Sequence, residues 1–113
     1  MLECCSCIGQ NVYEITQTGN LSRDFDTKSR LKRAALSIMN NLAEGFGRFG
    51  EKDSLRFYDI AKGSAYEVKS TIYVLEDIGY LSPEQLTQLR QLTDAALHLT
   101  LGWIRYLAQR KKP

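Results

Sequence analysis

The stretch from Leu31 to Glu67 constrains the fold of this 113-residue chain more than any other. Apolar residues recur every three or four positions on both sides of a segment that contains Gly45, Gly47 and Gly50. Each side is long enough for a helix, and glycine readily adopts the backbone conformations that end one. We therefore predict two helices that fold back on each other at this glycine-rich corner as an antiparallel hairpin.

The same periodicity predicts one helix before the hairpin and one after it. A turn at Gly19 ends the first helix, and Asp24 suits the positive N-terminal end of the second. The strongest local signal is Ser82-Pro83-Glu84-Gln85, which offers a serine cap, proline at the first helical position and glutamine at the third. Gly79, shortly before it, is a candidate C-cap for the third helix.

The expected helices span residues 2–17, 25–47, 51–78 and 83–110. Because the corners between them are short, consecutive helices are expected to lie antiparallel to each other. The sequence therefore predicts an all-α fold, an up-down-up-down four-helix bundle, in a single domain over residues 1–113.

Composition and charge are those of an ordinary globular protein, with 43% hydrophobic and 25% charged residues and a net charge of +2. No apolar run approaches the roughly 18 residues that a membrane span needs. The first residues also lack the basic and apolar regions of a secretory signal. We expect a cytoplasmic protein that does not contact membranes.

Cys4, Cys5 and Cys7 lie within one helical turn, which is a poor framework for disulfides. The spacing of Cys4 and Cys7 is one that can hold a metal or cycle between redox states. A zinc site needs two further ligands, and the only histidine is the distant His98. We interpret the cysteines as free thiols on a helix and expect no metal and no cofactor.

In an antiparallel hairpin, residues whose numbers add up to about 100 face each other across the two helices. Two of the resulting pairs have opposite charges, and the others are polar or small. The pairs are Arg33 with Glu67, Ser37 with Ser64 or Gly63, Asn41 with Asp59, and Glu44 with Arg56. We predict a polar seam that fixes the register of the two helices, with a functional pocket as the alternative.

A catalytic role would rest only on the seam carboxylates Glu44, Asp59 and Glu67. Di-iron bundles need a Glu-x-x-His motif on each of two helices, but Ala95 stands three residues before the single histidine, His98. The sequence also lacks a phosphate-binding G-x-x-x-x-G-K-[ST] loop and an H-E-x-x-H zinc motif. We therefore predict that the protein is not an enzyme and has no small-molecule substrate.

Three stretches, LKRAALSI at 31–38, NLAEGFGR at 41–48 and FYDIAKGSAYE at 57–67, resemble a known family. These are the four-helix bundle proteins encoded in intervening sequences of bacterial large-subunit ribosomal RNA genes, and the resemblance covers about residues 12–80. One departure is Lys32-Arg33, where members of the family usually carry two arginines. The family is also similar to the accessory variability protein of diversity-generating retroelements, a homopentamer that binds its reverse transcriptase and nucleic acid.

The resemblance implies a bundle fold and a homo-oligomer, a pentamer by the last comparison, and it implies no enzymatic activity. Our first hypothesis is that basic patches bind RNA or a nucleoprotein partner. The candidate residues are Lys28, Arg30, Lys32, Arg105, Arg110, Lys111 and Lys112. The alternative is an adaptor bundle that binds other proteins and touches no nucleic acid, in which these charges are only solvated. Salt-dependent binding to RNA would separate the two.

Overall fold

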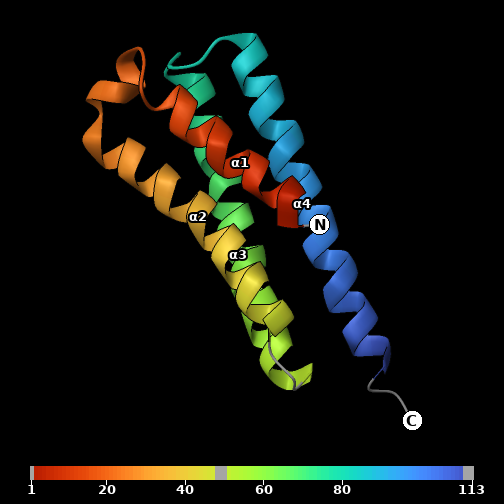
Figure 1. Ribbon diagram of the computed structural model, residues 1–113. Helices are drawn as coiled ribbons and strands as arrows, with labels where there is room; N and C mark the ends of the chain where they lie inside the picture. Colours follow the sequence, from red (N-terminus) through yellow and green to blue (C-terminus); the bar gives the residue numbers. More distant parts are fainter. Residues whose placement is uncertain (1, 48–50, 111–113) are drawn as a thin grey trace.

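The computed structural model describes residues 2–47 and 51–110, and all regular structure in these ranges is helical. The elements are α1 (Leu2–Ile15), the short 3₁₀ helix η1 (Asn20–Arg23), α2 (Phe25–Gly47), α3 (Glu51–Asp77) and α4 (Pro83–Arg110). The four long helices run alternately up and down (Figure 1). The predicted all-α helical bundle is confirmed, and the helix ends differ from the prediction by at most two residues.

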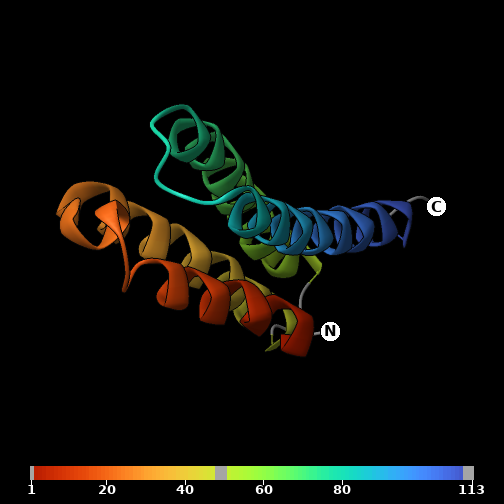
Figure 2. The same ribbon diagram turned by 90° about the horizontal axis from the view of Figure 1, so that it is seen from above.

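Each long helix packs against its neighbours in chain order, and α1 closes the arrangement by packing against α4. The bundle is elongated, with principal extents of 52 × 21 × 20 Å. Figure 2, seen from above, shows α1 beside α2 and α4 beside α3. Within the described ranges, no helix is both long and apolar enough to cross a membrane.

The core is built from the apolar faces that the helical periodicity indicates. Its fully buried large side chains come from all four long helices, and η1 adds Leu21. They include Ile8, Val12, Leu31, Ile38, Leu42, Val68, Ile72, Leu75 and Leu89. Sequence periodicity missed η1, because a single turn of 3₁₀ helix is too short to show a period.

The start of α2 is fixed by Asp24, as its position in the sequence indicates. The backbone N–H of Thr27 donates to Asp24 Oδ1 at 3.2 Å, and the Thr27 hydroxyl donates to Oδ2 at 2.9 Å. The Tyr80 hydroxyl, from the α3–α4 connection, donates to the same Oδ2 at 3.2 Å. These hydrogen bonds, the one from the Thr27 amide foremost, hold the pKa of Asp24 below its ordinary value.

The connection between α3 and α4 has the local structure that the sequence predicts. Gly79 has a φ of 72°, and the following Tyr80 N–H donates to the Leu75 carbonyl at 3.0 Å, which closes α3. Ser82 and Gln85 then form a reciprocal capping box. The Ser82 amide donates to Gln85 Oε1 at 2.9 Å, and the Gln85 amide donates to Ser82 Oγ at 3.2 Å.

α2 ends at Gly47, as expected, but Gly45 lies within the helix and does not end it. Both glycines are still helical, and among the described residues only Gly19 and Gly79 have positive φ. Gly45 is buried, and a Cβ there would lie 2.5 Å from Tyr58 Cε1. Glycine is therefore required by the close approach of α2 and α3. Gly50 lies outside the described residues.

The helices differ in length, and this shapes the corner end of the bundle. α1 has 14 residues and α4 has 28, so α4 extends past the start of α1 in both views (Figures 1 and 2). The Phe46 ring packs edge-on against Tyr58 and Trp103, with centroid distances of 5.5 Å. Trp103 in turn packs against Tyr106. A chain of aromatic rings thus links α2, α3 and α4 at this end.

Candidate nucleic-acid interface

Four basic residues lie along the N-terminal half of α2, and we refer to them as the α2 basic face: Lys28, Arg30, Lys32 and Arg33. Arg30 and Arg33 are exposed, and the two lysines are half-buried. Helical spacing divides them, because Lys28 and Lys32 project toward α1 and η1 whereas the arginines project toward α3. The buried residues Leu31, Ala34 and Ala35 hold the opposite face of α2 in the core. The cations are therefore presented outward by a rigid element.

The lysines of this face are accompanied by aromatic rings. Lys28 Nζ lies 5.9 Å from the ring centroid of Phe25, and Lys32 Nζ lies 4.7 Å from that of Tyr13 on α1. Lys28 Nζ also donates to the Ser22 carbonyl at 3.2 Å. These contacts restrain the ammonium groups without neutralising them.

An open groove of about 1030 Å³ lies over the outward surface of α2, between α1 and α3. Its lining includes three of the four side chains just described, Phe25, Tyr13 and Lys32, and apolar groups from α2 and α3. The lining residues include Tyr13, Phe25, Arg30, Lys32, Arg33, Leu36, Glu67 and Val74. Two carboxylates, Asp26 and Glu67, share the groove, so its charge is mixed on the α3 side.

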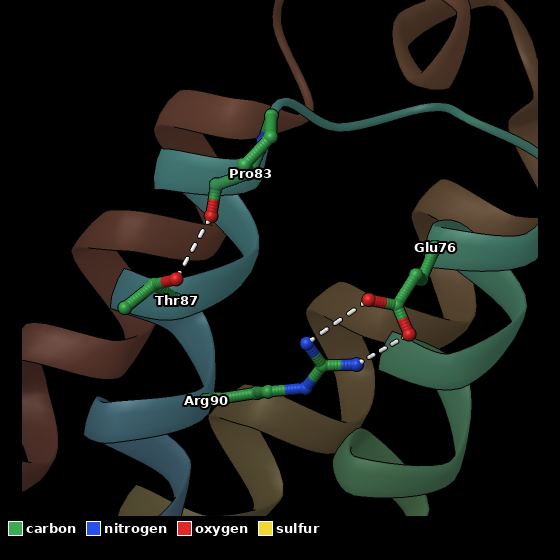
Figure 3. A network of polar contacts seen from close by, with 4 residues as sticks. All are labelled: Glu76, Pro83, Thr87 and Arg90. Atoms are coloured by element: carbon green, nitrogen blue, oxygen red, sulfur yellow. Dashed lines mark hydrogen bonds and ion pairs between the residues drawn. The ribbon is translucent and has the colours of Figure 1, made fainter.

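Two cations at the contact of α3 and α4, Lys69 and Arg90, are placed differently, because carboxylates neutralise them. Arg90 reaches from α4 to Glu76 on α3 with two hydrogen bonds of 2.8 and 3.3 Å (Figure 3). This guanidinium lowers the pKa of Glu76. Lys69 and Asp94 pair at 2.9 Å across the same two helices. Hydrogen bonding to Asp94 raises the pKa of Lys69.

By contrast, none of the four cations of the α2 basic face forms an ion pair with another residue in ranges 2–47 and 51–110. A phosphate group could therefore contact them without displacing a carboxylate. The face is the strongest candidate for anion binding that the structure describes.

The second group of predicted nucleic-acid contacts lies elsewhere. Arg105 is exposed on α4, and Arg110 is the last residue of that helix, with its side chain outside the described residues. Lys111 and Lys112 also lie outside the described residues. The C-terminal end of α4 and the N-terminal end of α2 are at opposite ends of the bundle (Figure 1). The member of this second group whose side chain is described, Arg105 on α4, is therefore not part of the α2 basic face.

The centre of the predicted polar seam is present. Ser37 Oγ and Ser64 Oγ share a hydrogen bond of 2.7 Å between α2 and α3. Asn41 Nδ2 donates to the Ser37 carbonyl at 2.8 Å and to Ser37 Oγ at 3.1 Å. Asn41 therefore joins the seam through Ser37, whereas its expected partner Asp59 is exposed and pairs with Lys62 on its own helix at 3.7 Å.

The charged pairs of the seam do not have the expected contacts. Arg33 and Glu67 are both exposed and border the same small hollow between α2 and α3, yet no ion pair joins them in the described part of the chain. Glu44 and Arg56 are also exposed, and the Arg56 guanidinium lies 5.5 Å from the ring centroid of Phe57. Both members of each expected pair are exposed, and within the described residues no ion pair joins Arg33 to Glu67 or Glu44 to Arg56.

Sequence reasoning missed two aromatic residues of the interface, Phe25 and Tyr13. Phe25 stands three residues before Lys28, a helical spacing that could have indicated the contact. Tyr13 meets Lys32 only through the packing of α1 on α2, so no local signal points to it.

Among the described residues, no group of three or more His, Cys, Asp and Glu side chains is placed to hold a metal ion. His98 and Cys7 are exposed, and the side chains of Cys4 and Cys5 lie outside the described residues.

Comparisons with known proteins agree with this fold. The model of a family described as 23S rRNA-intervening sequence protein matches residues 5–101. A crystal structure from Bacteroides thetaiotaomicron, described as a protein with unknown function from the S23 ribosomal protein family, has a TM-score of 0.77 at 22% identity. The match covers 91% of this chain and 93% of that one, and at this identity it shows the fold alone. Neither description names a catalytic activity. A search of curated proteins found no match.

Proposed function

Because the chain belongs to the 23S rRNA-intervening sequence protein family, we propose that it is a non-catalytic helical bundle that binds RNA through the α2 basic face. The observation that carries the proposal is the contrast between paired and unpaired cations. Lys69 and Arg90 are neutralised by carboxylates, whereas the four cations of α2 have no acidic partner among the described residues.

Phosphate binding to such cations is driven largely by the release of counterions from the nucleic acid. Glu67 and Asp26 weaken this attraction on the α3 side of the groove. Phosphates are therefore best placed near Lys28 and Lys32, at the α1 side. In a homo-oligomer the face would be repeated around a symmetry axis, which strengthens the local field although each chain carries a net charge of only +2.

The proposal is tested by RNA binding at increasing salt. The logarithm of the association constant should fall linearly with the logarithm of salt concentration, with a slope of about −0.7 per phosphate contact for single strands. Lys32→Gln should make this slope shallower. Lys69→Gln is the matched control, because it removes a cation that already has a carboxylate partner. Binding that ignores salt, or equal losses in the two variants, would contradict the proposal.

A second candidate, a structural or adaptor role, is favoured by the apolar side chains of the same groove. Leu36 and Val74 are 38% and 51% exposed and line it from α2 and α3. Exposed apolar groups rimmed by charges are typical of protein interfaces. The partner could be another copy of the chain, as the resemblance to a homopentamer implies. Native mass spectrometry tests this: Val74→Lys should shift the mass toward one chain, whereas Tyr73→Lys, on another surface of α3, should not.

A further inference from the structure

Two pairs of an aromatic ring and an ammonium group lie where α2 meets α1 and η1. Phe25, Lys32 and Tyr13 line the groove, and Lys28 adjoins Phe25. Phe25 is the most exposed large hydrophobic side chain among the described residues, at 71%. Its ring neighbours Lys28, and the next lysine along the helix, Lys32, neighbours Tyr13. Tyr13 is also exposed, at 39%. The contact between each ring and its ammonium group is favourable, and the exposed area of the ring remains available to a ligand.

This arrangement matches the two chemical parts of a nucleotide. A base stacks on an aromatic ring, and the adjoining phosphate contacts an ammonium group. The ammonium group of Lys28 has three N–H donors. One donates to the Ser22 carbonyl, so two remain available to a phosphate. Stacking on a side chain requires a base that is free of its own pairing and stacking. Bases in a duplex are not free in this way.

We infer that the α1 edge of the groove binds a single-stranded segment of RNA, with an unpaired base stacked on Phe25 and neighbouring phosphates held by Lys28 and Lys32. The inference rests on the RNA-binding function proposed above and specifies the form of RNA that is bound. Duplex RNA, which offers phosphates without free bases, would gain only the electrostatic part of the interaction.

The chain contains a matched surface that lacks this capacity. Tyr73 on α3 is 61% exposed, and the guanidinium of Arg90 lies 5.5 Å from its ring centroid. Here the cation is held by both carboxylate oxygens of Glu76 (Figure 3). Tyr73 therefore has a cation beside its ring, as Phe25 has, but Glu76 neutralises that cation. Tyr73 is thus the control for Phe25.

The test uses the full chain and a fluorescent single-stranded oligouridylate of about 12 nucleotides, whose bases stack little on one another, with the duplex of the same length for comparison. Fluorescence anisotropy should show tighter binding to the single strand. Phe25→Leu should weaken single-strand binding about fivefold or more, Phe25→Tyr should retain it, and Tyr73→Leu should leave it unchanged. Circular dichroism checks that each variant is folded, as expected for substitutions of exposed side chains.

Two further readouts separate stacking from charge. A 2-aminopurine placed in the oligonucleotide should change its fluorescence on binding to the wild type and to Phe25→Tyr, but not on binding to Phe25→Leu. Lys32→Gln should reduce the salt slope by about 0.7, whereas Phe25→Leu should leave it unchanged.

Equal affinity for single strand and duplex, or wild-type affinity in Phe25→Leu, would overturn this inference and leave the proposed RNA binding standing. Failure to bind either RNA at about 50 mM salt would overturn both.

Discussion

The two ends of the α2–α3 hairpin differ in how closely the side chains of the two helices pack. At the corner end, Gly45 lies against the ring of Tyr58, and the buried Ser54 hydroxyl donates to the Gly45 carbonyl at 2.8 Å. At the other end, Arg33 and Glu67 stand beside an open groove. The same two helices therefore meet closely at the corner end and have a groove over their outward surface at the other end.

The difference separates the parts of the hairpin that hold the fold together from those that can bind a partner. Close packing at Gly45 leaves no room for additional atoms, so substitutions there act on stability. At the groove end, the charged and aromatic side chains are exposed or half-buried and lie outside the core, so they can change with little cost to folding. The following substitutions test this division.

The largest effect is expected for Gly45→Ala. The new methyl group would clash with the buried Tyr58 ring and should lower the free energy of unfolding by about 1–3 kcal/mol. Gly63→Ala is the control, because α3 has open space around Gly63. It should raise stability by up to about 1 kcal/mol, since alanine is the better helix former. Urea unfolding of both variants measures the difference, and changes of the same sign would refute the division.

Ser54→Ala should cost about 1 kcal/mol, because it removes a buried hydrogen bond between α3 and α2. The matched variant Ser70→Ala removes a long, exposed bond of 3.4 Å within α3 and should change stability by less than about 0.5 kcal/mol. Equal losses of stability in the two variants would show that the buried Ser54 hydrogen bond contributes no more to stability than the exposed Ser70 bond.

At the open end, Asp24 should make stability depend on pH. Its pKa is lower in the folded chain than in the unfolded one, so the folded state gains stability when the carboxylate is ionised. That gain is complete above an ordinary aspartate pKa of about 3.9 and is lost as the pH falls through the lowered value. Asp24→Asn keeps a good capping residue but removes the charge. The stability difference between wild type and variant should be largest at neutral pH and should vanish in acid.

The smallest effect is expected for Glu67→Ala. Because Glu67 is exposed and not paired with Arg33, its removal should change the free energy of unfolding by no more than about 0.5 kcal/mol. Binding of RNA at low salt should become tighter, since a carboxylate leaves the groove. A loss of about 3 kcal/mol would instead indicate a buried ion pair and would remove the contrast between the two ends.

Local interactions in this chain could be predicted from the sequence because their partners are close in number. The Ser82–Gln85 capping box and the closing turn at Gly79 involve groups no more than five residues apart. The Ser37–Ser64 contact could be derived as well, because hairpin geometry sets which residues lie at the same level. The alternation of four helices follows from the period of the apolar residues.

The remaining features depend on the directions in which side chains point between helices, and periodicity does not define these directions. Residues at the same level of two helices can both point outward, as Arg33 and Glu67 do, and then no contact forms. The role of Gly45 depends on Tyr58 across the corner, and the contact of Lys32 with Tyr13 depends on how α1 lies on α2. The basic residues of the candidate site were thus predicted from the sequence, but its aromatic residues Phe25 and Tyr13 were not.

The corner end of the bundle, where α4 extends past α1, also contains an intrinsic fluorescent probe. Trp103, the single tryptophan of the chain, packs on Phe46 near the corner. Its emission reports on that end of the bundle, whereas far-UV ellipticity averages over every helix. If the two signals trace one denaturation curve, the bundle melts as a cooperative unit, and if emission changes first, the corner end melts ahead of the rest. The unmodified chain can therefore reveal how firmly its two ends are coupled.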